Sequence, residues 1–109
     1  MEKWRKGHAA RLLGALVGLA LAQGAWGAPG DMGKPSDSFQ TSSGTLEIVF
    51  IGHGSLLFLF NGMQIYVDPV RQYADYSKFP KADYILITHE HGDHLDAQAI
   101  GQLRQGTTR

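Results

Sequence analysis

The chain has 109 residues, 43% of them hydrophobic, and it contains no cysteine. This length accommodates one small domain at most, and the lack of cysteine excludes disulfides, thiolate metal sites and cysteine nucleophiles. The net charge is zero, but residues 1–27 carry four basic side chains against one acidic, a charge of +3, which leaves −3 for residues 28–109. Nucleic acid is therefore not an expected partner, because its binding depends on basic side chains that contact phosphates.

The first 27 residues have the pattern of a secretory signal peptide. Basic residues precede the eleven-residue apolar run LLGALVGLALA (residues 12–22), and small residues follow it up to Gly27. A membrane-spanning helix needs about 20 apolar residues, so a permanent anchor is disfavoured. We predict cleavage after Gly27. The protein would then be exported, periplasmic or secreted, with no stable membrane span once the signal is removed.

Residues 28–44 are rich in Gly, Pro, Ser and Asp. They carry too little apolar surface to offset the entropy cost of ordering, and we predict a flexible leader. The folded part should then span residues 45–109. A core built from about 65 residues is marginal without a metal or a partner, which indicates an incomplete domain.

The first strands are predicted by hydrophobic patterning. Apolar and polar residues alternate over 45–51 and again over 63–67, and residues 56–60 are apolar throughout. Period-2 alternation is typical of a strand with one buried face. Asn61-Gly62 predicts a two-residue hairpin turn between the second and third strands, because both residues adopt positive φ easily.

The remaining elements are a loop, a strand and a helix. A loop is predicted from Asp68 onward, because the proline that follows it cannot donate to a strand ladder. The apolar run 84–88 predicts a fourth strand, of the kind that is covered on both faces. A helix is predicted shortly after, with Asp96 as its N-cap. One helix cannot cover both faces of this sheet, so we expect apolar surface to remain exposed.

The chemistry is concentrated between the fourth strand and the helix. The segment 89–94 (HEHGDH) contains three imidazoles and two carboxylates. His89 and His91 are alternate residues of an extended chain, so both can reach one ion. A turn at Gly92 could bring Asp93 and His94 to the same cavity as ligands of a second ion. Imidazole is the commonest protein metal ligand, and ordinary polar residues at a strand end do not explain this density.

This segment resembles the His-x-His-x-Asp-His signature of the metallo-β-lactamase superfamily. The order of elements, with Gly-His-Gly-Ser at residues 52–55 before the hairpin, is similar to the branch that contains L-ascorbate-6-phosphate lactonase-like proteins and N-acyl-phosphatidylethanolamine phospholipase D-like hydrolases. The resemblance implies an α/β (α+β) fold, the N-terminal half of an αββα sandwich. The family's remaining ligands lie beyond Arg109, so we expect a fragment or a truncated product.

The resemblance also implies roles for individual residues. His89 and His91 would bind a first metal ion, and Asp93 and His94 a second; zinc is the usual metal, with manganese or iron in some members. Asp93 would also be the catalytic residue, holding the attacking water. Two further residues are candidates for supporting the ligands. They are Asp68, at the family's position for this role, and His53, whose flanking glycines suggest a loop close to the site.

The expected function is that of a metal-dependent hydrolase. Metal-activated hydroxide would attack an ester, lactone, amide or phosphodiester in a small-molecule or lipid substrate. The alternative is a non-catalytic metal-binding or interaction module that folds with a partner. This chain alone is expected to bind metal weakly and to be inactive, and its sequence does not indicate an oligomeric state.

Overall fold

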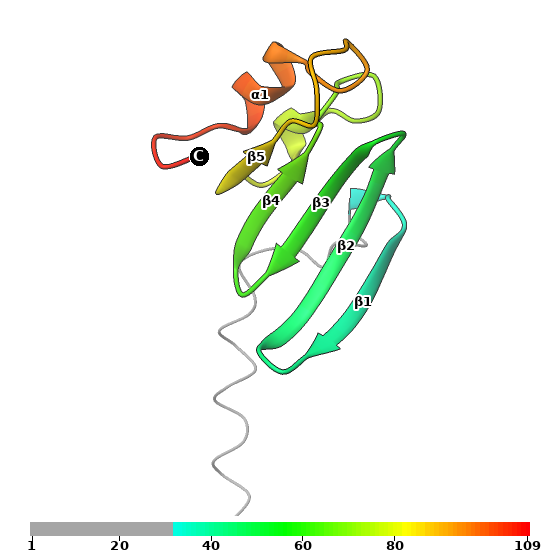
Figure 1. The fold of residues 1–109 in the computed structure, drawn as a ribbon, viewed down its shortest axis with the longest axis vertical. Helices are drawn as coiled ribbons and strands as arrows, with labels where there is room; N and C mark the ends of the chain where they lie inside the picture. The colour runs from blue at the N-terminus through cyan, green and yellow to red at the C-terminus, as the bar shows by residue number, and fades with distance from the viewer. Residues whose placement is uncertain (1–31) are drawn as a thin grey trace, which may run out of the picture.

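Five strands form one mixed sheet in their chain order (Figure 1). The structure, a computed structural model, describes residues 32–109, so the predicted signal peptide lies outside the described residues. The strands are β1 (Ser36–Thr41), β2 (Gly44–Gly52), β3 (Ser55–Phe60), β4 (Met63–Val67) and β5 (Tyr84–Leu86). The strands from β1 to β4 pair antiparallel, and β5 pairs parallel with β4.

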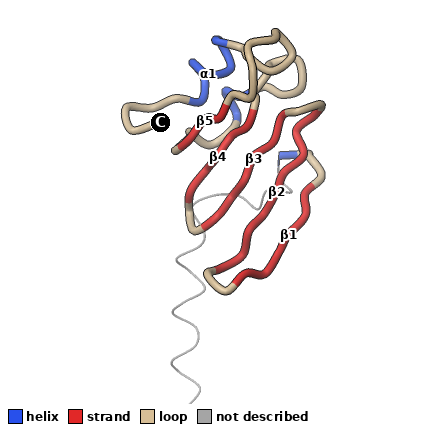
Figure 2. The backbone as a smooth tube through the Cα atoms, viewed as in Figure 1, coloured by secondary structure: helices blue, strands red, loops and turns tan. Residues whose placement is uncertain are grey.

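Two short helical elements follow β4 in the chain. A 3-10 turn, η2 (Tyr76–Lys78), interrupts the connection between β4 and β5, and α1 (Ala97–Leu103) follows β5 (Figure 2). The N-cap predicted at Asp96 is confirmed, since its carboxylate accepts the amide protons of Gln98 and Ala99. Within residues 32–109, no helix is long and apolar enough to cross a membrane.

The predicted strands are confirmed, with small differences in length. Asn61 and Gly62 form the turn between β3 and β4 with φ of 50° and 78°, as the Asn-Gly pair predicts. The fourth predicted strand is shorter than expected and ends at Leu86. Its predicted coverage on both faces is wrong, because it is the last strand in the sheet order and Leu86 is 52% exposed. Its continuation leaves the ladder because the Thr88 amide donates instead to the side chain of Asp68 (N–O distance 2.7 Å).

The flexible leader predicted over residues 28–44 is wrong from Ser36 onward. Residues 36–41 form β1, which pairs along its whole length with β2. The prediction considered only apolar burial, whereas an edge strand is stabilised by its backbone ladder and by polar cross-strand pairs. One such pair joins the Ser36 hydroxyl to the Glu47 carboxylate at 2.9 Å.

The core lies on the face of the sheet that α1 and η2 cover. Val49, Leu57 and Tyr66 stand opposite one another on β2, β3 and β4, and all three are fully buried. Ala99 and Leu103 of α1 and Tyr76 of η2 belong to the same buried cluster. The opposite face is only partly covered, because Phe50 is 41% and Leu86 is 52% exposed. The expected exposure of apolar surface is thus confirmed.

One edge of the sheet collects the residues that the motif singled out. The strands β2, β4 and β5 all end at this edge, and the loop between β5 and α1 lies beside it (Figure 1). His53 follows β2, Asp68 follows β4, and the segment 89–94 follows β5. Parallel strand ends therefore bring together side chains that are up to 41 positions apart in the sequence.

Candidate metal centre

The candidate metal centre includes a buried carboxylate, that of Asp68. Asp68 is 1% exposed and has a positive φ of 44° at the end of β4. Its Oδ1 accepts the Thr88 amide proton at 2.7 Å and its Oδ2 accepts the Thr88 hydroxyl proton at 2.6 Å. The same Oδ2 lies 2.7 Å from Nδ1 of His94. Asp68 thus joins the end of β4 to Thr88, the second residue after β5, and to the last histidine of the motif.

This network keeps Asp68 ionised. Burial raises its pKa, but the hydrogen bonds from Thr88 and the contact with His94 outweigh burial and hold the pKa below its usual range. An ionised carboxylate only accepts hydrogen bonds, so Nδ1 of His94 must donate. In the neutral ring, Nε2 of His94 then carries the lone pair that a metal ion requires.

Thr88 extends the same arrangement to a second imidazole. Its single hydroxyl proton goes to Asp68, so the hydroxyl oxygen can only accept from Nδ1 of His89, 2.9 Å away. In the neutral ring of His89, Nε2 is then the nitrogen that carries the lone pair. The rings of His89 and His94 have centroids 4.0 Å apart. Hydrogen bonds to one buried aspartate and one threonine thus orient two potential metal ligands.

The remaining motif side chains lie outward from this pair. His91 and Asp93 are exposed, and the ring of His91 packs edge-on against His89 with centroids 4.6 Å apart. The ligand atoms of His89, His91 and Asp93 lie within 4.8 Å of one another. A second group with the same spread consists of His53, Asp93 and His94. Asp93 belongs to both groups and lies between the two sets of imidazoles.

His53 reaches Asp93 from the turn between β2 and β3. Its Nε2 lies 3.0 Å from Oδ2 of Asp93, and its φ of 51° places it in the left-handed region. Desolvation raises the pKa of Asp93, but its backbone hydrogen bond, the nearby His94 and the contact with His53 together lower it. Asp93 is therefore a carboxylate at neutral pH, and only one of its oxygens is engaged by His53.

Glycine is required beside the centre at Gly54. A Cβ there would lie 2.9 Å from Cε1 of His94, closer than real Cβ contacts allow, and 3.2 Å from its Nδ1, which is tighter than most. The turn between β2 and β3 can approach the imidazole only because this position has no side chain. By contrast, a Cβ at Gly92 would meet nothing within 4 Å.

The structure therefore brings together all the residues singled out from the sequence. His89, His91, Asp93, His94, His53 and Asp68 form one connected cluster. Sequence reasoning missed Thr88, although its place directly before His89 is a usable signal. It also did not single out Tyr73, whose ring stacks on His53 with centroids 5.7 Å apart and 23° between the planes.

The donor set fits a divalent metal ion. Three motif imidazoles and one carboxylate converge, with Nε2 of His94 3.6 Å from Oδ2 of Asp93. Nitrogen and carboxylate ligands about 2.0–2.2 Å from a shared zinc ion are separated by roughly this distance in tetrahedral geometry. Nδ1 atoms of two imidazoles are held by oxygen acceptors, which is the usual arrangement behind metal-bound histidine.

The family is decided by comparison with known proteins. The beta-lactamase superfamily domain matches residues 47–106, which include most of β2, the strands from β3 to β5 and the whole cluster. The chain belongs to the metallo-β-lactamase superfamily. Its mixed sheet, with α1 and η2 on one face, is consistent with part of this superfamily's α/β domain.

Individual superfamily members show the same relationship. A UPF0173 protein of Pyrococcus abyssi is 45% identical over 66 residues, which cover 51% of this chain and 31% of the relative. The UPF0173 metal-dependent hydrolase of Flavobacterium johnsoniae is 43% identical over 63 residues, 52% of this chain and 28% of the relative. N-acyl-phosphatidylethanolamine-hydrolyzing phospholipase D 1 of Caenorhabditis elegans is 29% identical over 87 residues, 62% of this chain and 24% of the relative.

A solved structure agrees with the fold of this superfamily member. A crystal structure of a protein from Parabacteroides distasonis matches with a TM-score of 0.66 and 56% sequence identity, covering 68% of this chain and 34% of that one. The chain thus spans about a quarter to a third of the length of these relatives.

Proposed function

We propose that this chain supplies the N-terminal part of a metal-dependent hydrolase. One or two divalent ions would bind, zinc first because imidazole and carboxylate donors suit it, with manganese or iron as alternatives. One observation carries the proposal. Asp68 and Thr88 accept hydrogen bonds from Nδ1 of two imidazoles and so orient their Nε2 atoms, beside an ionised, exposed carboxylate. The proposed ligands are His89, His91, Asp93 and His94.

The reaction would be hydrolysis at neutral pH. A bound divalent ion lowers the pKa of its water toward about 7 and supplies the nucleophile. Asp93 is the proposed catalytic residue, because its lowered pKa leaves a carboxylate that can accept a hydrogen bond from the attacking water and orient it. His53 holds one oxygen of that carboxylate at 3.0 Å and leaves the other free for this task.

The proposed substrate is a small molecule or lipid with an ester, lactone, amide or phosphodiester bond. Two relatives support this breadth: one is named a metal-dependent hydrolase, and another is named for hydrolysing a phospholipid. A phosphorus or carbonyl centre would each develop an oxyanion that a positively charged site stabilises. A substrate panel containing all four bond types therefore tests the proposal directly.

The experiment uses the full-length gene product, purified with zinc or manganese present and examined by elemental analysis. Substituting both His89 and His91 by alanine should abolish binding at the first site and hydrolysis with it. The control is Glu90→Ala, which removes an exposed carboxylate of the same motif and should keep metal and activity. A metal-free wild type contradicts the proposal. A metal-loaded wild type inactive on the whole panel would instead favour a non-catalytic metal-binding module.

We also propose that the protein is exported, with residues 1–27 as its signal peptide. The support is the basic start and the short apolar run of the sequence. Mass spectrometry of the mature protein should find its N-terminus at Ala28. An intact Met1 on the exported product would contradict this.

A further inference from the structure

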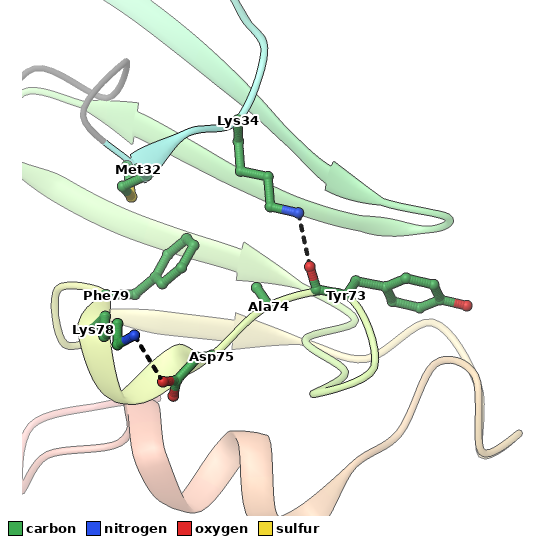
Figure 3. A pocket seen from close by; sticks show the side chains of 7 residues that line it. All are labelled: Met32, Lys34, Tyr73, Ala74, Asp75, Lys78 and Phe79. Carbon is green, nitrogen blue, oxygen red and sulfur yellow. Dashed lines mark hydrogen bonds and ion pairs between the residues drawn. The ribbon is translucent and has the colours of Figure 1, made fainter.

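Lys34 makes two backbone contacts, one of them with the end of β2, close in sequence to His53. Its ammonium donates to the carbonyl of Ile51 at 2.9 Å and to the carbonyl of Tyr73 at 2.7 Å. Figure 3 shows it reaching from the segment before β1 across to Tyr73. Lysine usually keeps its strongly hydrated ammonium in water, so two backbone acceptors indicate a structural link. Lys34 joins the end of β2 to the connection after β4.

Tyr73 transmits this link toward the centre. Its side chain covers Gly52, where a Cβ would lie only 3.0 Å from Cβ of Tyr73. Its ring then stacks on His53, with centroids 5.7 Å apart. Stacked aromatic rings at this separation attract each other weakly but restrict each other's orientation. Tyr73 therefore lies between Lys34 and the imidazole that contacts Asp93.

His53 depends on such support. Its side chain is 48% exposed and that of its partner Asp93 is 49% exposed. An ion pair or hydrogen bond between two half-exposed side chains is worth little by itself, because water competes for both. The left-handed backbone of His53 and the stack on Tyr73 are what aim its Nε2 at Asp93.

We propose that Lys34 and Tyr73 are positioning residues of the metal centre: together they hold His53 in the orientation that fixes one oxygen of Asp93. The proposal rests on the proposed function, since it concerns how a ligand carboxylate is aimed. Substituting a residue that orients a metal ligand typically lowers metal affinity by about 10–100-fold. Lys34 acts one step further away, so removing its ammonium should weaken zinc binding by about threefold to tenfold.

The experiment measures zinc affinity by chelator competition in the full-length protein, together with the visible spectrum of its cobalt(II) form. Lys34→Met removes the ammonium and keeps the aliphatic stem. The control is Lys78→Met, because Lys78 lines the same pocket but, within residues 32–109, forms its ion pair with Asp75 alone, 3.6 Å away (Figure 3). A second pair is Tyr73→Leu, which removes the stacked ring, and Tyr73→Phe, which keeps it.

The expected result is weaker zinc binding and an altered cobalt spectrum for Lys34→Met and Tyr73→Leu, with Lys78→Met and Tyr73→Phe like wild type. Equal affinities for Lys34→Met and Lys78→Met would overturn the proposal. So would a lowered melting temperature with an unchanged cobalt spectrum, since the contacts would then serve folding alone. A wild type that binds no metal would show instead that the proposed function fails, and the proposal with it.

The last link is tested at His53. His53→Phe keeps a ring for Tyr73 to stack on but removes the donor to Asp93, and it should alter the cobalt spectrum as Tyr73→Leu does. His53→Gln restores an N–H at a similar reach and should recover much of the affinity. Equal behaviour of the two variants would contradict a hydrogen-bonding role for His53.

Discussion

The two halves of the candidate metal centre differ in how firmly the fold holds them. On the inner half, His94 is only 18% exposed and contacts a buried aspartate. On the outer half, Asp93 is 49% exposed and its hydrogen-bond partner His53 is equally accessible. The inner half is therefore formed by the sheet itself, whereas the outer half depends on turns and on contacts such as the Lys34 link. Metal affinity should be more sensitive to changes on the inner side.

The largest effect in this comparison should come from Asp68→Asn. The amide cannot accept from the Thr88 amide, the Thr88 hydroxyl and His94 at once, so the tautomer of His94 would no longer be specified. We expect zinc affinity to fall by about 10–100-fold in the full-length protein. Chelator competition measures this, with Asp75→Asn as the control, an exposed aspartate whose pKa is also lowered, chiefly by Ser77. Equal affinities of the two variants would show that the inner network does not matter for binding.

A smaller effect is expected from adding a methyl group on each half. Gly54→Ala would push its Cβ against His94, which Asp68 prevents from moving away, and zinc affinity should fall by about tenfold. Gly92→Ala lies in the motif itself but meets open space, and its affinity should stay close to wild type. The same titration measures both. If Gly92→Ala were the more damaging change, the assignment of inner and outer halves would be wrong.

The smallest effect concerns the core on which both halves rest. Burial raises the pKa of the Tyr66 phenol well above its usual value, with Tyr76 adding to the effect. The folded state thus keeps this proton to a higher pH than the unfolded chain does. The contribution of the phenol to the free energy of unfolding is therefore fully present below about pH 10 and is lost as the pH rises further. Tyr66→Phe loses the hydrogen bond to Pro80, worth about 1 kcal/mol, but should lose less additional stability between pH 8 and pH 11.

Urea unfolding of the full-length protein at several pH values measures this difference. Zinc affinity at neutral pH should be unchanged in Tyr66→Phe, because the phenol points to Pro80 and not to the centre. Parallel loss of stability in both proteins would mean that Tyr66 does not contribute to the alkaline transition.

Much of the fold was predictable because its signals are local. The alternation over residues 63–67 predicted β4 with its observed bounds, and Asn61-Gly62 predicted the turn before it. Asp96 could be identified as an N-cap because its partners are the next few amides. β1 was missed because a polar edge strand has no hydrophobic period, and only its pairing with β2 stabilises it.

The sequence by itself determined the donor set and the superfamily, because the motif residues 89–94 are contiguous and their chemistry does not depend on distant contacts. Only the tertiary structure decided which residues orient those donors. Asp68 meets Thr88, and Lys34 meets Tyr73, across sequence separations of 20 and 39 residues. Such contacts arise from strand order and register, which place the ends of β2, β4 and β5 at one edge, and no local pattern encodes them.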